Sequence, residues 1–155
     1  MDKLYVSSEG LDKLKSDLAY CYENRMKIAA VIEQARGYGD LSENAEYHAA
    51  KEEQAKLHAR IRDLEDKVAR AVILDDTRID PSKAYQGAFV KVLNKKTARE
   101  CTYHLVSPVE TDSASGKISV QAPVGKALLG HGEGETVVVT IPAGDLELEI
   151  LEITR

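Results

Sequence analysis

The sequence predicts an α+β protein, in which an N-terminal antiparallel α-helical coiled-coil hairpin precedes a small β-sheet domain with one short helix. Three observations carry this prediction. Apolar residues recur with heptad spacing over residues 11–35 and again over 47–71. The connection between these segments is short and contains Gly37 and Gly39, which break helices. From about residue 84 the apolar period changes from that of a helix to that of a strand.

The two heptad segments define two helices of similar length. The first follows a possible capping sequence, Ser7-Ser8, and we interpret its one polar seam residue, Arg25, as snorkelling past Cys21 rather than fixing the register. Such a short connection makes the helices antiparallel. A helix of about 27 residues spans about 40 Å, so the connection lies far from any globular body at the other end. The seam positions are Leu11, Leu14, Leu18, Cys21, Arg25, Ile28, Ile32 and Ala35, then Tyr47, Ala50, Gln54, Leu57, Ile61, Leu64, Val68 and Ala71.

The second half of the chain alternates short strands with turns. We predict domain boundaries of 1–75 for the hairpin, 76–83 for a polar linker and 84–155 for the β-sheet domain. A short helix ended by Gly130 fits between the third and fourth strands. The predicted strands are residues 87–93, 101–106, 118–120, 135–141 and 146–153.

Composition excludes several classes of protein. The chain of 155 residues has no run of about 18 apolar residues, so we expect no membrane contact, and its start has no secretory pattern. The net charge of −5 argues against wrapping of free nucleic acid. Cys21 and Cys101 fit neither a disulfide framework nor a metal-ligand spacing, which favours a cytoplasmic location.

The connection carries two acids, Asp40 and Glu43, next to the second helix. One interpretation is a capping box, in which each side chain accepts a backbone N–H at the start of that helix. The other is half of a Mg²⁺ site, because two carboxylates bind the ion weakly and need further ligands from a partner. The length of the helices, and the apolar Tyr38 and Leu41 at the tip, favour delivery of the acids to a partner. The two roles are compatible, since a capping carboxylate keeps free lone pairs.

Two stretches resemble family signatures. The first runs from Ala35 to Lys51 and includes Gly39-Asp40-Leu41-Ser42-Glu43-Asn44. The second is Ile118-Ser119-Val120 followed by residues 122–130. Together they resemble the tip and C-terminal signatures of the bacterial Gre transcript-cleavage and elongation factors. The similarity covers nearly the whole chain, with both signatures in the family order.

The resemblance implies a fold and a mechanism. The C-terminal domain would be FKBP-like and dock on bacterial RNA polymerase, while the hairpin tip enters the polymerase secondary channel. There the nascent RNA 3′ end of a backtracked complex would be cleaved by the polymerase itself, so the chain would not be an enzyme. The resemblance assigns Asp40 and Glu43 to a Mg²⁺ shared with the polymerase and not stably bound by the chain alone. Ser42 and Asn44 would position the attacking water or the phosphate.

The resemblance also implies basic residues that guide the RNA, and here the candidates are Arg36 and Lys51. For Arg60 and Arg62 we favour a solvated flank paired with neighbouring acids. We interpret His48 as structural. DNA binding and a monomeric state are further expectations.

Three alternatives remain open at this point. The first is a regulator that binds the same polymerase channel without stimulating cleavage. The second is an independent coiled-coil adaptor whose acids only cap a helix. The third, a small prolyl isomerase, is disfavoured because the β-sheet domain has few aromatic residues to line a proline pocket.

Overall fold

The computed structural model describes residues 2–37 and 44–155. The chain forms two compact units, each described separately below. The hairpin unit comprises the chain up to Leu4 together with Leu11–Ala71. The C-terminal unit comprises Tyr5–Gly10 and Val72–Arg155, so it includes a short segment from the beginning of the chain.

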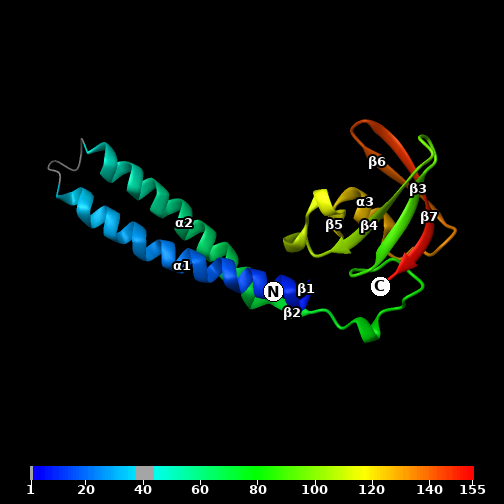
Figure 1. The fold of residues 1–155 in the computed structure, drawn as a ribbon, viewed down its shortest axis with the longest axis horizontal. Helices are drawn as coiled ribbons and strands as arrows, with labels where there is room; N and C mark the ends of the chain where they lie inside the picture. Colours follow the sequence, from blue (N-terminus) through cyan, green and yellow to red (C-terminus); the bar gives the residue numbers. More distant parts are fainter. Residues whose placement is uncertain (1, 38–43) are drawn as a thin grey trace. The chain divides into compact units, whose positions relative to one another are not determined.

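Two long helices form the hairpin unit, and Figure 1 shows them side by side. Helix α1 spans Ser8–Arg36, with its first residues in the C-terminal unit, and α2 spans Ala45–Arg70. The predicted seam is confirmed, because every seam position except Arg25 is buried or half-buried. Arg25 is exposed, and its guanidinium lies 4.9 Å from the centroid of the Tyr22 ring. The helix prediction was one residue too long at its end, because Ala71 is the C-cap of α2 and begins a strand.

Five strands form one mixed sheet in the C-terminal unit, in the order β5-β4-β3-β7-β6. All neighbouring pairs are antiparallel except β4 and β5. The strands are β3 (Phe89–Asn94), β4 (Arg99–Val106), β5 (Lys117–Ser119), β6 (Thr136–Ile141) and β7 (Gly144–Thr154). The short helix α3 spans Pro123–Leu128, and 3-10 turns occur at Asp76–Arg78, Pro108–Glu110 and Ser113–Ser115. This arrangement confirms the predicted α+β class.

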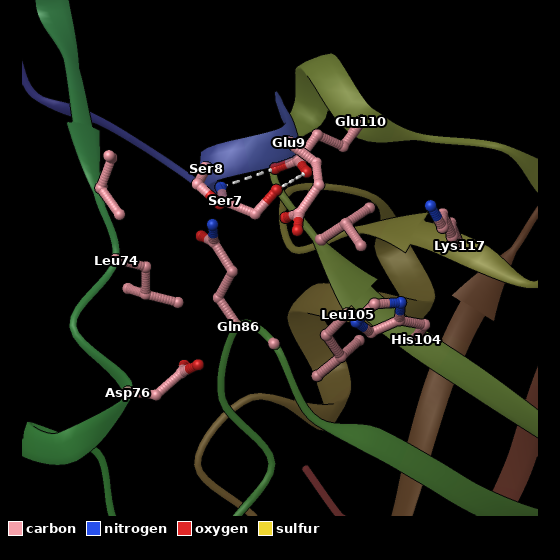
Figure 2. Close-up of a pocket in the computed structure, with 13 residues that line it drawn as sticks. Ser7, Ser8, Glu9, Leu74, Asp76, Gln86, His104, Leu105, Glu110 and Lys117 are labelled. Carbon is pink, nitrogen blue, oxygen red and sulfur yellow. Dashed lines mark hydrogen bonds between the residues drawn. The ribbon is translucent and has the colours of Figure 1, made fainter. Parts of the chain in front are cut away.

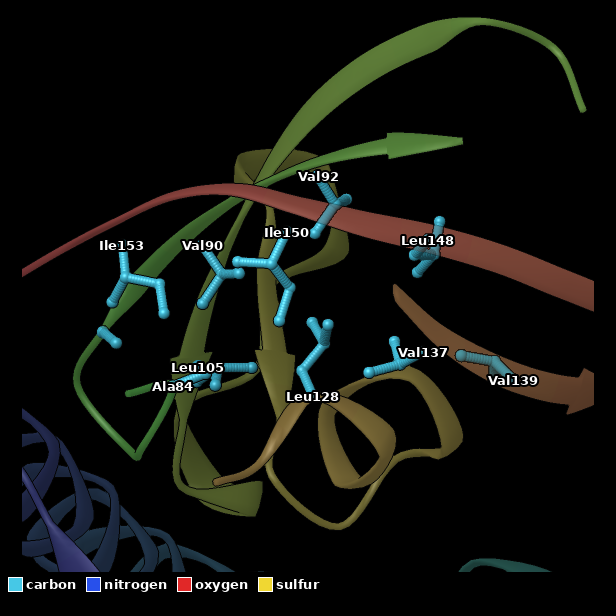
Figure 3. Packing of buried hydrophobic residues seen from close by; sticks show 11 residues of the cluster. Ala84, Val90, Val92, Leu105, Leu128, Val137, Val139, Leu148, Ile150 and Ile153 are labelled. Atoms are coloured by element: carbon cyan, nitrogen blue, oxygen red, sulfur yellow. The ribbon is translucent and has the colours of Figure 1, made fainter. Parts of the chain in front are cut away.

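The core of the C-terminal unit lies between the sheet and α3 (Figure 3). Alternation along the strands explains it, since Val90 and Val92 of β3 and Leu148 and Ile150 of β7 face inward. Leu128 of α3 covers them and is fully buried. The full set is Ala84, Ala88, Val90, Val92, Leu105, Leu128, Val137, Val139, Leu148, Ile150 and Ile153.

A second sheet of two short strands was not predicted. Strand β1 (Leu4–Val6) pairs with β2 (Ala71–Ile73), and Leu74 N donates to Val6 O at 2.9 Å. Three-residue strands are too short to produce a recognisable alternation, which is why the sequence did not indicate them. The predicted boundaries at residues 75 and 83 stay a prediction.

Candidate functional site: the neck of the hairpin and the C-terminal cavities

The residues that carry the predicted metal site, Asp40 and Glu43, lie outside the described part of the chain, as do Tyr38 and Ser42. Their predicted roles therefore stay predictions. The structure does describe the neck of the hairpin, which we define as the last turn of α1 and the first turn of α2. Among the described residues, no group of three or more His, Cys, Asp or Glu side chains could hold a metal ion.

Asn44 is the N-cap residue of α2. Its backbone is extended, and its side-chain Oδ1 accepts a hydrogen bond from Tyr47 N at 3.1 Å. Asparagine suits this position because its short side chain satisfies an amide that has no intrahelical partner. The amide group also contacts α1, since Nδ2 donates to Ala35 O at 2.7 Å. The described cap of α2 is therefore Asn44, whereas the sequence suggested Asp40 for that role.

The candidate RNA-guiding residues flank this neck. Arg36 ends α1 and lies 3.7 Å from Glu33, while Lys51 donates to Gln54 at 3.1 Å. Both basic side chains are solvent-exposed, and surface pairs of this kind are weak. Either side chain can therefore leave its neighbour for a phosphate. Arg60 lies 3.9 Å from Asp63, as expected for a solvated flank.

A polar link between the helices lies further from the neck. The Tyr22 hydroxyl of α1 donates to Glu65 Oε1 of α2 at 2.5 Å, and Arg25 stacks on the Tyr22 ring. Sequence reasoning missed this link because Tyr22 and Glu65 lie outside the heptad seam. The hydrogen bond to Glu65, followed by desolvation, raises the pKa of Tyr22 above its usual value.

This link predicts a pH dependence for the hairpin. A raised pKa means that the neutral phenol is favoured by folding, so its stabilisation is complete below the unfolded pKa of about 10 and is lost as pH rises through the folded pKa. The difference in tyrosinate absorbance between wild type and Tyr22→Phe should therefore titrate above about pH 10. Glu65→Gln should lower that midpoint. A Tyr22 midpoint at or below about 10 would contradict the link.

A cavity of the C-terminal unit, with a volume of about 570 Å³, lies beside residues 7–9 (Figure 2). One wall carries Glu110, whose carboxylate accepts from Ser7 N at 3.1 Å and from the Ser7 hydroxyl. The same hydroxyl accepts from Gly10 N at 3.0 Å, so Ser7 caps α1 as its position predicted. A carboxylate at a helix N-terminus is also favoured by the helix dipole.

Gly10 leaves room for this contact, because a Cβ at this position would overlap the Glu110 carboxylate and displace the end of that side chain from Ser7. In an ordinary helix, Gly→Ala stabilises by about 0.5–1 kcal/mol. Here we expect Gly10→Ala to destabilise the protein by about 1–3 kcal/mol, since Glu110 must leave Ser7. In a Glu110→Ala background the same change should become stabilising. Denaturant unfolding of the four proteins tests this reversal, and stabilisation by Gly10→Ala alone would contradict it.

His104 and Lys117 line another part of this cavity. The His104 ring stacks on Phe89 with centroids 4.0 Å apart. Burial, reinforced by the charge of Lys117, lowers the pKa of His104. The imidazole is therefore neutral at physiological pH, and Lys117 provides the local positive charge.

A second, more apolar groove of about 510 Å³ lies near the C-terminal signature. Val120 and Leu129 from the signature line it together with Ile79 and Tyr85. Gly125 allows the backbone of α3 to approach Ser119 closely, because a Cβ at this position would overlap the carbonyl of Ser119. Tyr85 is the one aromatic residue among those lining this groove.

Comparisons with known proteins identify the family. Residues 4–73 match the family described as "Transcription elongation factor, N-terminal", and residues 80–155 match "Transcription elongation factor, GreA/GreB, C-term". The chain belongs to the GreA/GreB family of transcription elongation factors. This confirms the predicted family and the predicted class of function.

Curated relatives with the name "Transcription elongation factor GreA" include the following two. The one from Flavobacterium psychrophilum is 46% identical over 152 residues, covering 97% of this chain and 96% of the relative. The one from Thermodesulfovibrio yellowstonii is 44% identical over 154 residues, covering 99% and 98%. A GreA/GreB structure from Nitrosomonas europaea is 26% identical, covers 100% of both chains and has a TM-score of 0.45.

Membership of the GreA/GreB family narrows the earlier alternatives. It favours a transcription elongation factor over an independent coiled-coil adaptor and over a prolyl isomerase. The expectation of DNA binding receives no support from the comparisons. In the described part of the chain, no helix has the length and apolar character needed to span a membrane.

Proposed function

We propose that this chain is a transcription elongation factor that stimulates bacterial RNA polymerase to cleave its own backtracked transcript, and so rescues arrested complexes. The observation that carries this proposal is the full-length match to the family, with both halves in order. The two curated relatives described above are covered over 96% and 98% of their own length. In this function the chain has no active site of its own.

The hairpin would deliver Asp40 and Glu43 through the secondary channel to the polymerase active site. Helices of 29 and 26 residues support this role, because at about 1.5 Å per residue they reach about 40 Å. The two carboxylates would supply some of the oxygen ligands of a Mg²⁺ ion that the polymerase completes, and such an ion activates water and stabilises the leaving oxygen. Arg36 and Lys51, exposed beside the neck, would contact the phosphates of the nascent RNA 3′ end.

The C-terminal unit would bind the rim of the polymerase channel. Its apolar groove at Val120 and Leu129 supports this assignment, because apolar concave surfaces bind side chains of protein partners. The groove lies at the second family signature, beside the close contact of Gly125 with Ser119. We infer that one monomer acts on one polymerase.

A cleavage assay tests the proposed function. Polymerase is stalled and backtracked on labelled RNA, and Mg²⁺ is added with polymerase alone, this protein alone, or both. Shortened transcripts should accumulate rapidly only when both proteins are present. Cleavage by this protein alone would reveal a nuclease instead. Binding to polymerase without faster cleavage would favour the alternative, a channel regulator that does not stimulate cleavage.

A further inference from the structure

The side chain of Asn44 joins the ends of the two long helices. Its Oδ1 accepts from Tyr47 N in the first turn of α2, and its Nδ2 donates to Ala35 O in the last turn of α1. The orientation of the amide follows from chemistry, because only the nitrogen can donate to a carbonyl. One side-chain amide therefore provides a hydrogen-bond partner for a backbone N–H in the first turn of α2 and for a backbone carbonyl in the last turn of α1, neither of which has a partner within its own helix.

Among the common N-cap residues, only asparagine can make both contacts. Serine, threonine and aspartate offer an acceptor to the helix, but a carboxylate has no donor, and a hydroxyl is a single short group. The carbonyl that receives the second hydrogen bond belongs to Ala35, which is only 2% exposed. Leaving a buried carbonyl without a hydrogen bond costs free energy, and this cost favours the conformation in which the Asn44 amide donates to Ala35 O.

We propose that Asn44 is a positioning residue, which joins the end of α1 to the start of α2 and so sets the separation of the two helix ends, between which the sequence carries Asp40 and Glu43. This inference rests on the proposed function, since residues 36–43 lie between the two anchored points. Fixing both ends of a short connection removes many of its conformations, and precise placement of ligands depends on such support. Asn44 thus acts through Ala35 and Tyr47, in place of the direct contact with water or phosphate that the family resemblance suggested.

Two variants isolate the donor. Asn44→Asp and Asn44→Ser both keep an acceptor for Tyr47 N. Aspartate has no donor for Ala35 O, and the single serine hydroxyl lies one bond closer to the backbone than the Asn44 amide nitrogen, so it cannot serve both partners. Asn24→Asp, on α1 away from the neck, is the matched control for the change of an amide to a carboxylate. With saturating protein, cleavage of backtracked transcripts should fall about 10–100-fold in both Asn44 variants, the range seen when supporting residues of a metal site are lost.

The measurement separates positioning from binding and from folding. In both variants, the protein concentration that gives half-maximal cleavage should stay the same as in wild type. The Mg²⁺ concentration that gives half-maximal cleavage should rise. The Tyr47 amide should remain protected from hydrogen exchange. Wild-type cleavage in either variant would overturn the proposal. Loss of polymerase binding in parallel with cleavage would overturn it as well.

A separate readout distinguishes the failure of this inference from the failure of the proposed function. Nuclear magnetic resonance of the protein alone should show the Asn44 side-chain amide exchanging more slowly than that of Asn24. If wild type does not stimulate cleavage, the proposed function fails, whatever this exchange shows. If wild type stimulates cleavage and the two amides exchange equally fast, only the inference about Asn44 fails.

Discussion

Replacing Asp40 by Asn, or Glu43 by Gln, is expected to lower the stimulated cleavage rate by about 10²–10³-fold, as for other losses of preorganised charge stabilisation. The amides keep the size of the side chains but bind Mg²⁺ far more weakly than carboxylates do. Polymerase binding should persist, because the C-terminal unit is unchanged. Single-turnover cleavage with saturating factor measures the effect.

The control for this experiment is Glu52→Gln, which removes the same charge from an exposed position on α2. We expect wild-type cleavage from this variant. The helix content of Asp40→Asn and Glu43→Gln should equal that of wild type, because Asn44 provides the cap of α2. Unfolding of the hairpin in either variant would mean that capping is the main role of the acids. Full cleavage by the double variant would contradict the metal role.

Ile150→Ala is expected to destabilise the C-terminal unit by about 2–5 kcal/mol. Ile150 is fully buried in the core, lies opposite Val92 in the sheet and takes part in two backbone hydrogen bonds that join β7 to residues 134 and 135. Removing its side chain leaves a cavity that a sheet held on both sides cannot close. Native-state hydrogen exchange of β3 and β7 amides measures the loss, with the middle of the hairpin as an internal reference.

Val138→Ala provides the matched control in the same sheet. Val138 lies on the outer face of β6 and is 56% exposed, so its truncation should change stability by only about 0.5 kcal/mol. Equal effects of the two substitutions would contradict the assignment of the core to the inner face.

Most of the fold could be predicted from the sequence because its periodicities are long and regular. Two seams of eight positions each identified the hairpin, and fifteen of those positions are buried or half-buried. The exception, Arg25, was already the one polar residue of the first seam. The five strands of the main sheet were found because each alternates over several residues or follows a clear turn.

Contacts between side chains distant in sequence could not be predicted. Nothing in the local pattern of Ser7 indicates that Glu110, 103 residues away, covers the helix N-terminus. Gly10 was a signal, since glycine in the first turn of a long helix needs a reason, but it does not identify the partner. Asn44 was found through the family signature and assigned a contact with water or phosphate, whereas its described partners are backbone groups.

The composition of the C-terminal unit matters for anyone who divides this chain into fragments. The family match begins at residue 80, yet the unit also contains Tyr5–Gly10 and Val72–Leu74. A fragment cut at the linker would expose the Glu110 carboxylate and remove the backbone oxygen of Tyr5 that receives the Gln86 amide at 2.8 Å. A rearranged fragment, in which residues 5–10 are appended after Arg155, would retain more of the native contacts than the continuous stretch 80–155. The C-terminal unit is therefore discontinuous in sequence, because it combines residues 5–10, which precede the hairpin, with residues 72–155, which follow it.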